Sequence, residues 1–230
     1  MNGALLMLAD GRFPAGGHVH SAGIESAVAD GRVVDLAMLA DYVRGRLATV
    51  GLTDAALAAA TVVHLATDDD SVRRAMIERL DDEADARIPA PPLREASRRQ
   101  GRQLVRVASR SWPSALLATI ADVRPRGAHV AIAFGATGFV AGLDEVEVAA
   151  LSLHHAIATP TQAALRLLGL DPFAVAALAV DLAREAEAVA ALATELGRTV
   201  PVDELPAASG PIVDLAACDH QRWDMRLFAT

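Results

Sequence analysis

The residues best suited to chemistry lie near the N-terminus, in the stretch GRFPAGGHVHSAGIE. His18 and His20 are two positions apart on a glycine-rich turn, and Glu25 follows five residues later. Two imidazoles and a carboxylate so spaced could ligate one metal ion, although no HExxH or similar pattern completes the set. Alternatively, the two glycines make a tight turn whose histidines hydrogen-bond the ends of the next helix. A transient or shared metal site at His18 and His20 and a packed corner both remain open.

The other candidates for chemistry do not combine into a catalytic set. His154 and His155 are neighbours on an expected helix, about 100° apart around its axis, and so are poorly placed to share an ion. Cys218 precedes Asp219 and His220, but sequence neighbours on an extended segment rarely form an oriented nucleophile and base. The sequence therefore predicts a protein that is not an enzyme.

Every basic residue of the chain other than histidine is an arginine, because the sequence contains no lysine. A P-loop needs its lysine at the β- and γ-phosphates, and Schiff-base chemistry needs a lysine amine. An ordinary P-loop nucleotide hydrolase and a pyridoxal-phosphate enzyme are therefore excluded. If a nucleotide matters to the function, we expect another protein to hydrolyse it.

The charge and composition of the chain limit which partners it can bind and in which cellular compartment it can work. The net charge of −8 argues against nucleic acid as a partner. The single cysteine, Cys218, rules out an internal disulfide and any site built from several cysteines. The N-terminal residues lack the basic region of a signal peptide, and the longest apolar run is short and glycine-rich for a membrane span. We expect a cytoplasmic protein with no membrane partner.

A regular series of arginines runs along one expected helix, beginning at residue 93. The series comprises Arg94, Arg98, Arg102, Arg106 and Arg110, with Arg99 beside it. A four-residue spacing makes a slowly drifting basic stripe on a helix surface. Such a stripe could bind an acidic or phosphorylated partner. It could equally be a solvated face balanced by the carboxylates at 81–85.

The spacing of apolar residues is helical almost throughout, and alanine, valine and leucine dominate. Expected helices cover 36–47, 53–65, 69–85, 93–110, 114–123, 129–143, 144–168 and 172–196. Pro160 should kink or split its helix, and Gly197 should end the last one. The sequence predicts an all-α fold: a single compact helical domain of about eight to ten helices over residues 1–200. A proline-marked, extended C-terminal arm for partner docking follows over residues 201–230.

Four segments, in order, are similar to segments of urease accessory proteins of the F type, the UreF family. DGRFPAGGHVHSAGIE resembles the family's Asp…Pro…Gly…His-Ser…Gly…Glu pattern. REASRRQGRQL resembles its Glu…Ser…Gly…Leu helix, and HVAIAFGATG its His…Phe-Gly segment. PIVDLAACDHQRWDMRLFAT resembles its C-terminal tail. The matching positions are Asp10, Pro14, Gly16 or Gly17, His20, Ser21, Gly23, Glu25, Glu95, Ser97, Gly101, Leu104, His129, Phe134, Gly135, Pro211, Asp214, His220, Arg226, Leu227 and Phe228.

The resemblance implies an all-α protein that forms a homodimer. It would join a D/H-type urease accessory protein and a G-type GTPase in a complex that delivers nickel to apo-urease. In that complex the F subunit is a scaffold and GTPase regulator without catalytic residues. No cofactor would be permanently bound, and nickel would pass through or beside the subunit. The chain departs from the family pattern at Leu170, where a glutamine is expected.

We predict two local roles from these segments. His20 and Glu25 would line an internal polar path or a contact between subunits, unless Ser21 merely caps the helix that Glu25 enters. The tail would dock the D/H-type partner. The full set of predicted partner-binding or polar-path residues is His20, Ser21, Glu25, Glu95, Arg98, Arg102, Arg166, His220, Arg226, Leu227 and Phe228. The alternatives are a metalloenzyme using His18, His20 and Glu25, and a helical adaptor unrelated to urease that uses the arginine stripe.

Overall fold

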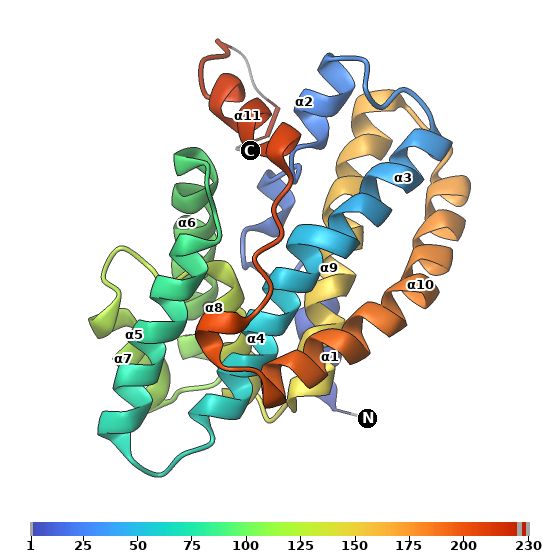
Figure 1. The fold of residues 1–230 in the computed structure, drawn as a ribbon. Helices are drawn as coiled ribbons and strands as arrows, with labels where there is room; N and C mark the ends of the chain where they lie inside the picture. The colour runs from blue at the N-terminus through green and yellow to red at the C-terminus, as the bar shows by residue number, and fades with distance from the viewer. Residues whose placement is uncertain (1, 225–226, 229–230) are drawn as a thin grey trace.

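The computed structural model describes residues 2–224 and 227–228, apart from the side chain of His18, and these residues form helices and turns without a strand. The all-α prediction is confirmed (Figure 1). The α-helices are α1 (Gly3–Ala9), α2 (Ile24–Ala29), α3 (Leu36–Arg46), α4 (Leu52–Leu65), α5 (Asp70–Ala86), α6 (Pro91–Ser111), α7 (Ala115–Val123), α8 (Val130–Val140), α9 (Glu145–Leu168), α10 (Pro172–Thr199) and α11 (Pro211–His220). Three single turns complete the set: η1 (Gly17–Val19), η2 (Leu47–Gly51) and η3 (Val202–Glu204).

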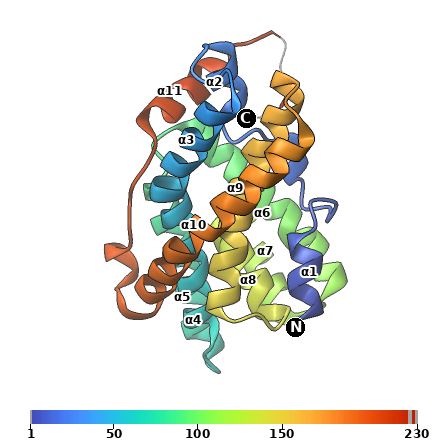
Figure 2. The same cartoon turned by 90° about the vertical axis from the view of Figure 1, so that its right-hand side faces the viewer.

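Helix α4 is the centre of the fold, packed by α8, α9 and α10, with α5 beside its end (Figures 1 and 2). Five of its 14 residues are alanine, so its neighbours can approach closely. A Cβ atom on Gly135 of α8 would lie 2.5 Å from the carbonyl oxygen of Ala58. One on Gly197 of α10 would lie 2.8 Å from the amide nitrogen of Ala60. Glycine is therefore required where α8 and α10 cross α4.

Two of the predicted helix boundaries are wrong, and tertiary packing explains the first. Gly197 does not end its helix, because α10 continues to Thr199 and uses this glycine to contact α4. The helix expected over 144–168 is found as α9, which runs unsplit through the buried Pro160 to Leu168. Asp144 forms a capping box at the start of α9, and Asp171 caps α10.

The second wrong boundary is at residue 53, where no side-chain cap begins a helix. Helices α3 and α4 are instead joined by the π-helical turn η2 into one helical run over residues 36–65. By length and composition this run could cross a membrane, but 61% of its most apolar window is buried inside the fold. Burial on that scale is typical of the core helix of a water-soluble protein.

After α10 the chain turns back and runs the length of the molecule to α11, which lies beside α2 and α6 (Figures 1 and 2). Arg87, at the end of α5, holds the start of this arm. Its guanidinium donates hydrogen bonds to the carbonyl oxygens of Pro206 (2.9 Å), Leu205 (3.0 Å) and Val202 (3.2 Å). Further along, the hydroxyl of Thr53 donates to the carbonyl oxygen of Ala208. The arm therefore follows one defined course against α4 and α5.

Candidate functional site

The glycine-rich corner turns the chain sharply before α2. Gly16 and Gly23 adopt φ values of +85° and +83°, in the left-handed region that glycine tolerates best. A Cβ on Gly23 would also lie 2.8 Å from the Cγ1 atom of Val213, on α11 of the arm. The hydroxyl of Tyr42 donates a 2.8 Å hydrogen bond to the carbonyl oxygen of Ala22. The corner is thus shaped to receive α11.

Glu25, in the first turn of α2, is the centre of the candidate site. Only 6% of the residue is exposed. Its Oε2 atom accepts hydrogen bonds from Nε2 of His220, at 2.8 Å, and from the backbone N–H of Phe228, at 3.2 Å. Its Oε1 atom accepts one from the N–H of Leu227, at 2.7 Å. We call this arrangement of Glu25, His220, Leu227 and Phe228 the Glu25 clamp, because one buried carboxylate fixes the end of the arm.

The two apolar residues at the end of the arm have opposite environments. Phe228 is 6% exposed and packs in the core, with the guanidinium carbon of Arg166 4.8 Å from the centre of its ring. Leu227 is 79% exposed. Of these two predicted partner-binding or polar-path residues, Leu227 is therefore exposed to a partner, whereas Phe228 is buried within the chain. A turn at the clamp sends successive side chains in opposite directions.

Most of the predicted site residues are brought together here. His20 and Ser21 are buried in the turn before α2, and Ser21 Oγ accepts a 3.4 Å hydrogen bond from the N–H of Glu25. The N-cap position itself is Gly23, so Ser21 is not the cap residue that the sequence suggested. Arg166 joins the group through Phe228. Arg226 lies outside the described residues.

The predicted residues Glu95, Arg98 and Arg102 are not part of this cluster. Glu95 and Arg102 are exposed on α6. The guanidinium of Arg98 instead donates to Asp81, at 2.9 Å, and to Asp85, at 2.8 Å, both on α5. Of the two interpretations of the arginine stripe, balance by the carboxylates at 81–85 therefore describes its first half.

Asp81 is a second buried carboxylate, at 0% exposure. Arg98 and the backbone N–H of His129 donate hydrogen bonds to it, the latter at 2.6 Å. Arg124 forms an ion pair with it, with Nε 2.9 Å from Oδ2. We call this group the Asp81 network. It joins α5 to α6 and to the turn before α8.

The ring of His129 extends the same network. Burial lowers the pKa of His129, although the nearby Asp85 and Asp81 carboxylates oppose that shift. The neutral ring then donates from Nε2 to Asp85, at 2.9 Å, and accepts at Nδ1 from the hydroxyl of Ser97, at 3.0 Å. Ser97 Oγ in turn accepts from the N–H of Val130. Two of the segments that are similar to UreF, the one with Ser97 and the one with His129, therefore meet in a hydrogen-bond network inside the fold.

Possible ion and small-molecule sites are few in the described part of the chain. No group there combines three histidine, cysteine or acidic side chains placed to hold a metal ion. His154 and His155 instead bind the end of α1, with Nε2 atoms 3.3 Å and 2.8 Å from the carbonyl oxygens of Ala9 and Leu8. The side chain of His18 is not described, so the His18–His20 site stays a prediction.

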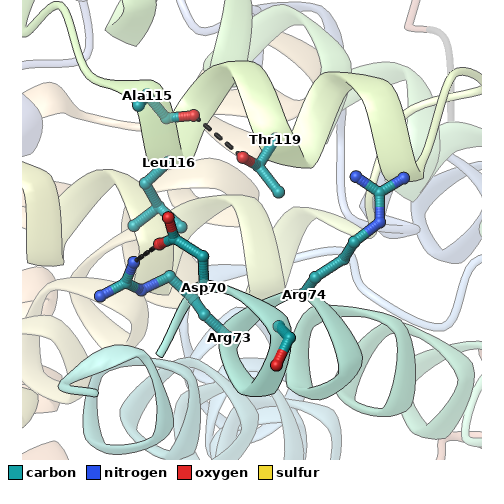
Figure 3. A pocket seen from close by; sticks show the side chains of 7 residues that line it. Asp70, Arg73, Arg74, Ala115, Leu116 and Thr119 are labelled. Atoms are coloured by element: carbon teal, nitrogen blue, oxygen red, sulfur yellow. Dashed lines mark hydrogen bonds and ion pairs between the residues drawn. The ribbon is translucent and has the colours of Figure 1, made fainter. Parts of the chain in front are cut away.

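A shallow pocket lies between the start of α5 and α7 (Figure 3). Its charged side chains already have partners within the chain. Arg73 pairs with Asp70 in the same helix turn, and Arg74 pairs with Asp122 at 2.9 Å. Leu116 and Thr119 complete the wall. The pocket offers neither a nucleophile with a base nor an unsatisfied charge.

Comparisons with known proteins agree with the resemblance seen in the sequence. A family model described as UreF matches residues 33–183. The Urease accessory protein UreF of Mycobacterium sp. (strain JLS) is 42% identical over 226 residues, covering 98% of this chain and 97% of the relative. The chain belongs to the UreF family. UreF proteins of Mycolicibacterium vanbaalenii and Mycobacterium tuberculosis (strain H37Rv) cover the same shares, at 42% and 38% identity.

Membership of the UreF family makes the chain a urease accessory protein rather than an enzyme. It also sets aside the metalloenzyme and the adaptor unrelated to urease. The matched range of the family model stops short of both Glu25 and His220. The full-length UreF relatives nevertheless align across the region that contains them.

Sequence reasoning missed two residues that position the site. Arg87 gave no signal, because its partners are backbone carbonyls whose place depends on the course of the arm. Asp81 was seen only as one of several carboxylates at 81–85. Its neighbour Asp82 is largely exposed, whereas Asp81 is buried. A helical period fitted to α5 from Ile77 and Leu80 would have placed Asp81 on the inner side.

Proposed function

We propose that this protein is a scaffold in urease maturation that joins a D/H-type accessory protein and a G-type GTPase, and that this complex inserts nickel into apo-urease. Family membership supports a role in urease maturation. The observation that carries the finer proposal is the arm, which is anchored to the body by the Glu25 clamp and presents apolar side chains outward. Nickel is the cargo of the complex, and the chain holds no permanent cofactor.

The outward side of the arm is suited to a protein partner. Ile212 and Leu215, three residues apart on α11, are 63% and 69% exposed, and Leu227 is 79% exposed. Side chains three apart on a helix share a face, so the first two form one apolar patch. Apolar residues exposed together are typical of an interface. We propose that the D/H-type accessory protein binds here.

The Glu25 clamp has a defined task in this proposal. The carboxylate, the imidazole and the two backbone amides of the clamp bind one another. These hydrogen bonds hold the patch of Ile212 and Leu215 in a fixed orientation. Preorganisation of this kind lowers the entropic cost of binding. The role of His20 and Glu25 in an internal polar path, the homodimer and the cytoplasmic location remain parts of the proposal. They rest on the family resemblance and the composition.

The first experiment measures urease activity in cells that carry the urease subunits and the other accessory proteins, with and without this chain, at limiting nickel. Activity that appears only with the chain supports the proposal. Equal activity in both would contradict it.

The arm is tested separately by co-purification with the D/H-type accessory protein. We expect Ile212→Asp with Leu215→Asp to abolish association, because two charges would be buried in the interface. Val72→Asp, at an exposed apolar position on α5, is the matched control. Association that survives the arm variant and also survives removal of residues 211–230 would show that the arm is not the docking site.

A further inference from the structure

The outer face of α6 carries a straight line of long polar side chains. Arg99, Gln103, Arg106 and Arg110 follow one another at intervals of four, three and four residues. At 100° per residue they fall within an arc of about 60° and extend over about 16 Å of the helix. Arg99, Gln103, Arg106 and Arg110 are all in contact with solvent, and the three arginines are exposed. We call these four residues the arginine seam.

Within the described part of the chain, the arginines of the seam have no carboxylate partner. In the first half of α6, Arg98 pairs with Asp81 and Asp85, and Arg94 lies 3.9 Å from Asp85. Among the described residues, no carboxylate lies within 4.0 Å of the guanidinium groups of Arg99, Arg106 and Arg110. Three unpaired positive charges on one face are unusual in a chain of net charge −8.

A groove runs beside the seam, between α6 and the glycine-rich corner. Pro14, Gln103, Arg106, Val107 and Arg110 line it. The side-chain amide of Gln103 donates a 3.1 Å hydrogen bond to the carbonyl oxygen of Pro14, which fixes the corner against the helix. The groove thus has an apolar side, from proline and valine, and a basic side. This combination fits a segment that carries both apolar and acidic side chains.

We propose that the arginine seam binds an acidic α-helix of a partner protein. A helix with carboxylates at positions i, i+4, i+7 and i+11 repeats the spacing of the seam, so each carboxylate faces a guanidinium or the Gln103 amide. Guanidinium groups bind carboxylates through two parallel hydrogen bonds. A nucleic acid or anionic membrane fits less well, because the basic surface is one line wide on an acidic protein. This surface differs from the patch of Ile212 and Leu215, and the proposal does not depend on the proposed function.

The test uses purified full-length protein and two fluorescent 15-residue peptides with blocked ends. One has glutamates at the seam spacing in an alanine and glutamine background, and the other has the same composition with the glutamates two apart. We expect the first peptide to bind at least tenfold more tightly by fluorescence anisotropy, with affinity falling as salt increases. Arg106→Gln with Arg110→Gln should weaken that binding at least tenfold.

The control variant is Arg74→Gln with Arg184→Gln, which removes two exposed arginines on α5 and α10 and should bind like the unchanged protein. Equal binding of the two peptides would overturn the proposed helix register. An unchanged affinity of the Arg106 and Arg110 variant would overturn the site. Tighter binding of a DNA duplex or of vesicles containing phosphatidylserine, lost in the same variant, would replace the acidic helix with another class of partner.

Discussion

Glu25 and Asp81 are both buried carboxylates that bind distant segments, but their partners differ in kind. Asp81 accepts from Arg98 and from the backbone of His129, both in packed parts of the domain. Glu25 accepts from three groups within residues 220–228. Opening the Asp81 network requires helices to separate, whereas opening the Glu25 clamp requires only the arm to lift. The first site therefore maintains the fold, and the second controls a detachable segment.

The largest effect should follow Asp81→Ala. Arg98 and Arg124 would lose their shared carboxylate and the N–H of His129 would lose its acceptor, which should reduce the free energy of unfolding by about 3–5 kcal/mol. Chemical denaturation measures this directly. Asp82→Ala, at the exposed neighbouring position, is the control, with an expected loss below about 1 kcal/mol. If both variants lost the same free energy of unfolding, the burial of Asp81 would not explain its contribution to stability.

A smaller loss, of about 2–3 kcal/mol, is expected for Arg87→Gln, because several carbonyl oxygens at the start of the arm lose their donor. Thermal unfolding gives the change in stability, and hydrogen exchange shows where it occurs. We expect faster exchange in residues 201–210 and little change in α8. Faster exchange throughout the protein would show that Arg87, like Asp81, stabilises the whole domain and not only the arm.

Glu25→Ala should change global stability by about 1 kcal/mol or less, because the freed amides can reach water once the arm lifts. Limited proteolysis should instead cut residues 221–228 much faster than in the unchanged protein. Glu25→Gln is the conservative comparison: its side-chain oxygen can accept one hydrogen bond, so it should give an intermediate rate. A loss of stability as large as that for Asp81→Ala would break the comparison between the two carboxylates.

The smallest change, a gain, is expected at Asp54, which lies next to the arm-binding residue Thr53. Burial raises the pKa of Asp54 to about 6, against the opposing effect of Arg46. A raised carboxyl pKa stabilises the fold below the unfolded value of 3.8, and this contribution is lost as the pH rises through 6. Asp54→Asn should therefore stabilise the protein by about 1 kcal/mol at pH 8 and change little at pH 4, allowing for partial exposure. Denaturation at both pH values measures it; an equal effect at both would exclude titration as the cause.

What the sequence predicted correctly depended on local chemistry. The helices expected from residues 144 and 172 begin within one residue of those positions, because the side chains of Asp144 and Asp171 accept from amides two or three residues away. A glycine inside the helix expected over 93–110 has a similarly limited cause, since a Cβ on Gly101 would lie 2.0 Å from the carbonyl oxygen of Ala128. Such features can be predicted from the sequence because each depends on nearby residues or on contact with one other segment.

What the sequence could not predict depended on contacts between distant segments. Gly197 looks like a helix terminator, and only the crossing with α4 explains why the helix passes through it. Phe228 looks like an exposed anchor until Glu25 is seen to bind its backbone amide and turn the ring inward. The candidate site was therefore predicted as two separate motifs, and their meeting required the structure.

The Glu25 clamp also has a consequence for the order of events during synthesis. Glu25 precedes Leu227 by 202 residues, so α2 leaves the ribosome long before the arm exists. The clamp can close only after residues 220–228 have left the ribosome, whereas helices α3 to α10 can already have packed around α4. Each new molecule therefore passes through a stage with a folded body and an open arm. A partner present during translation meets that stage first.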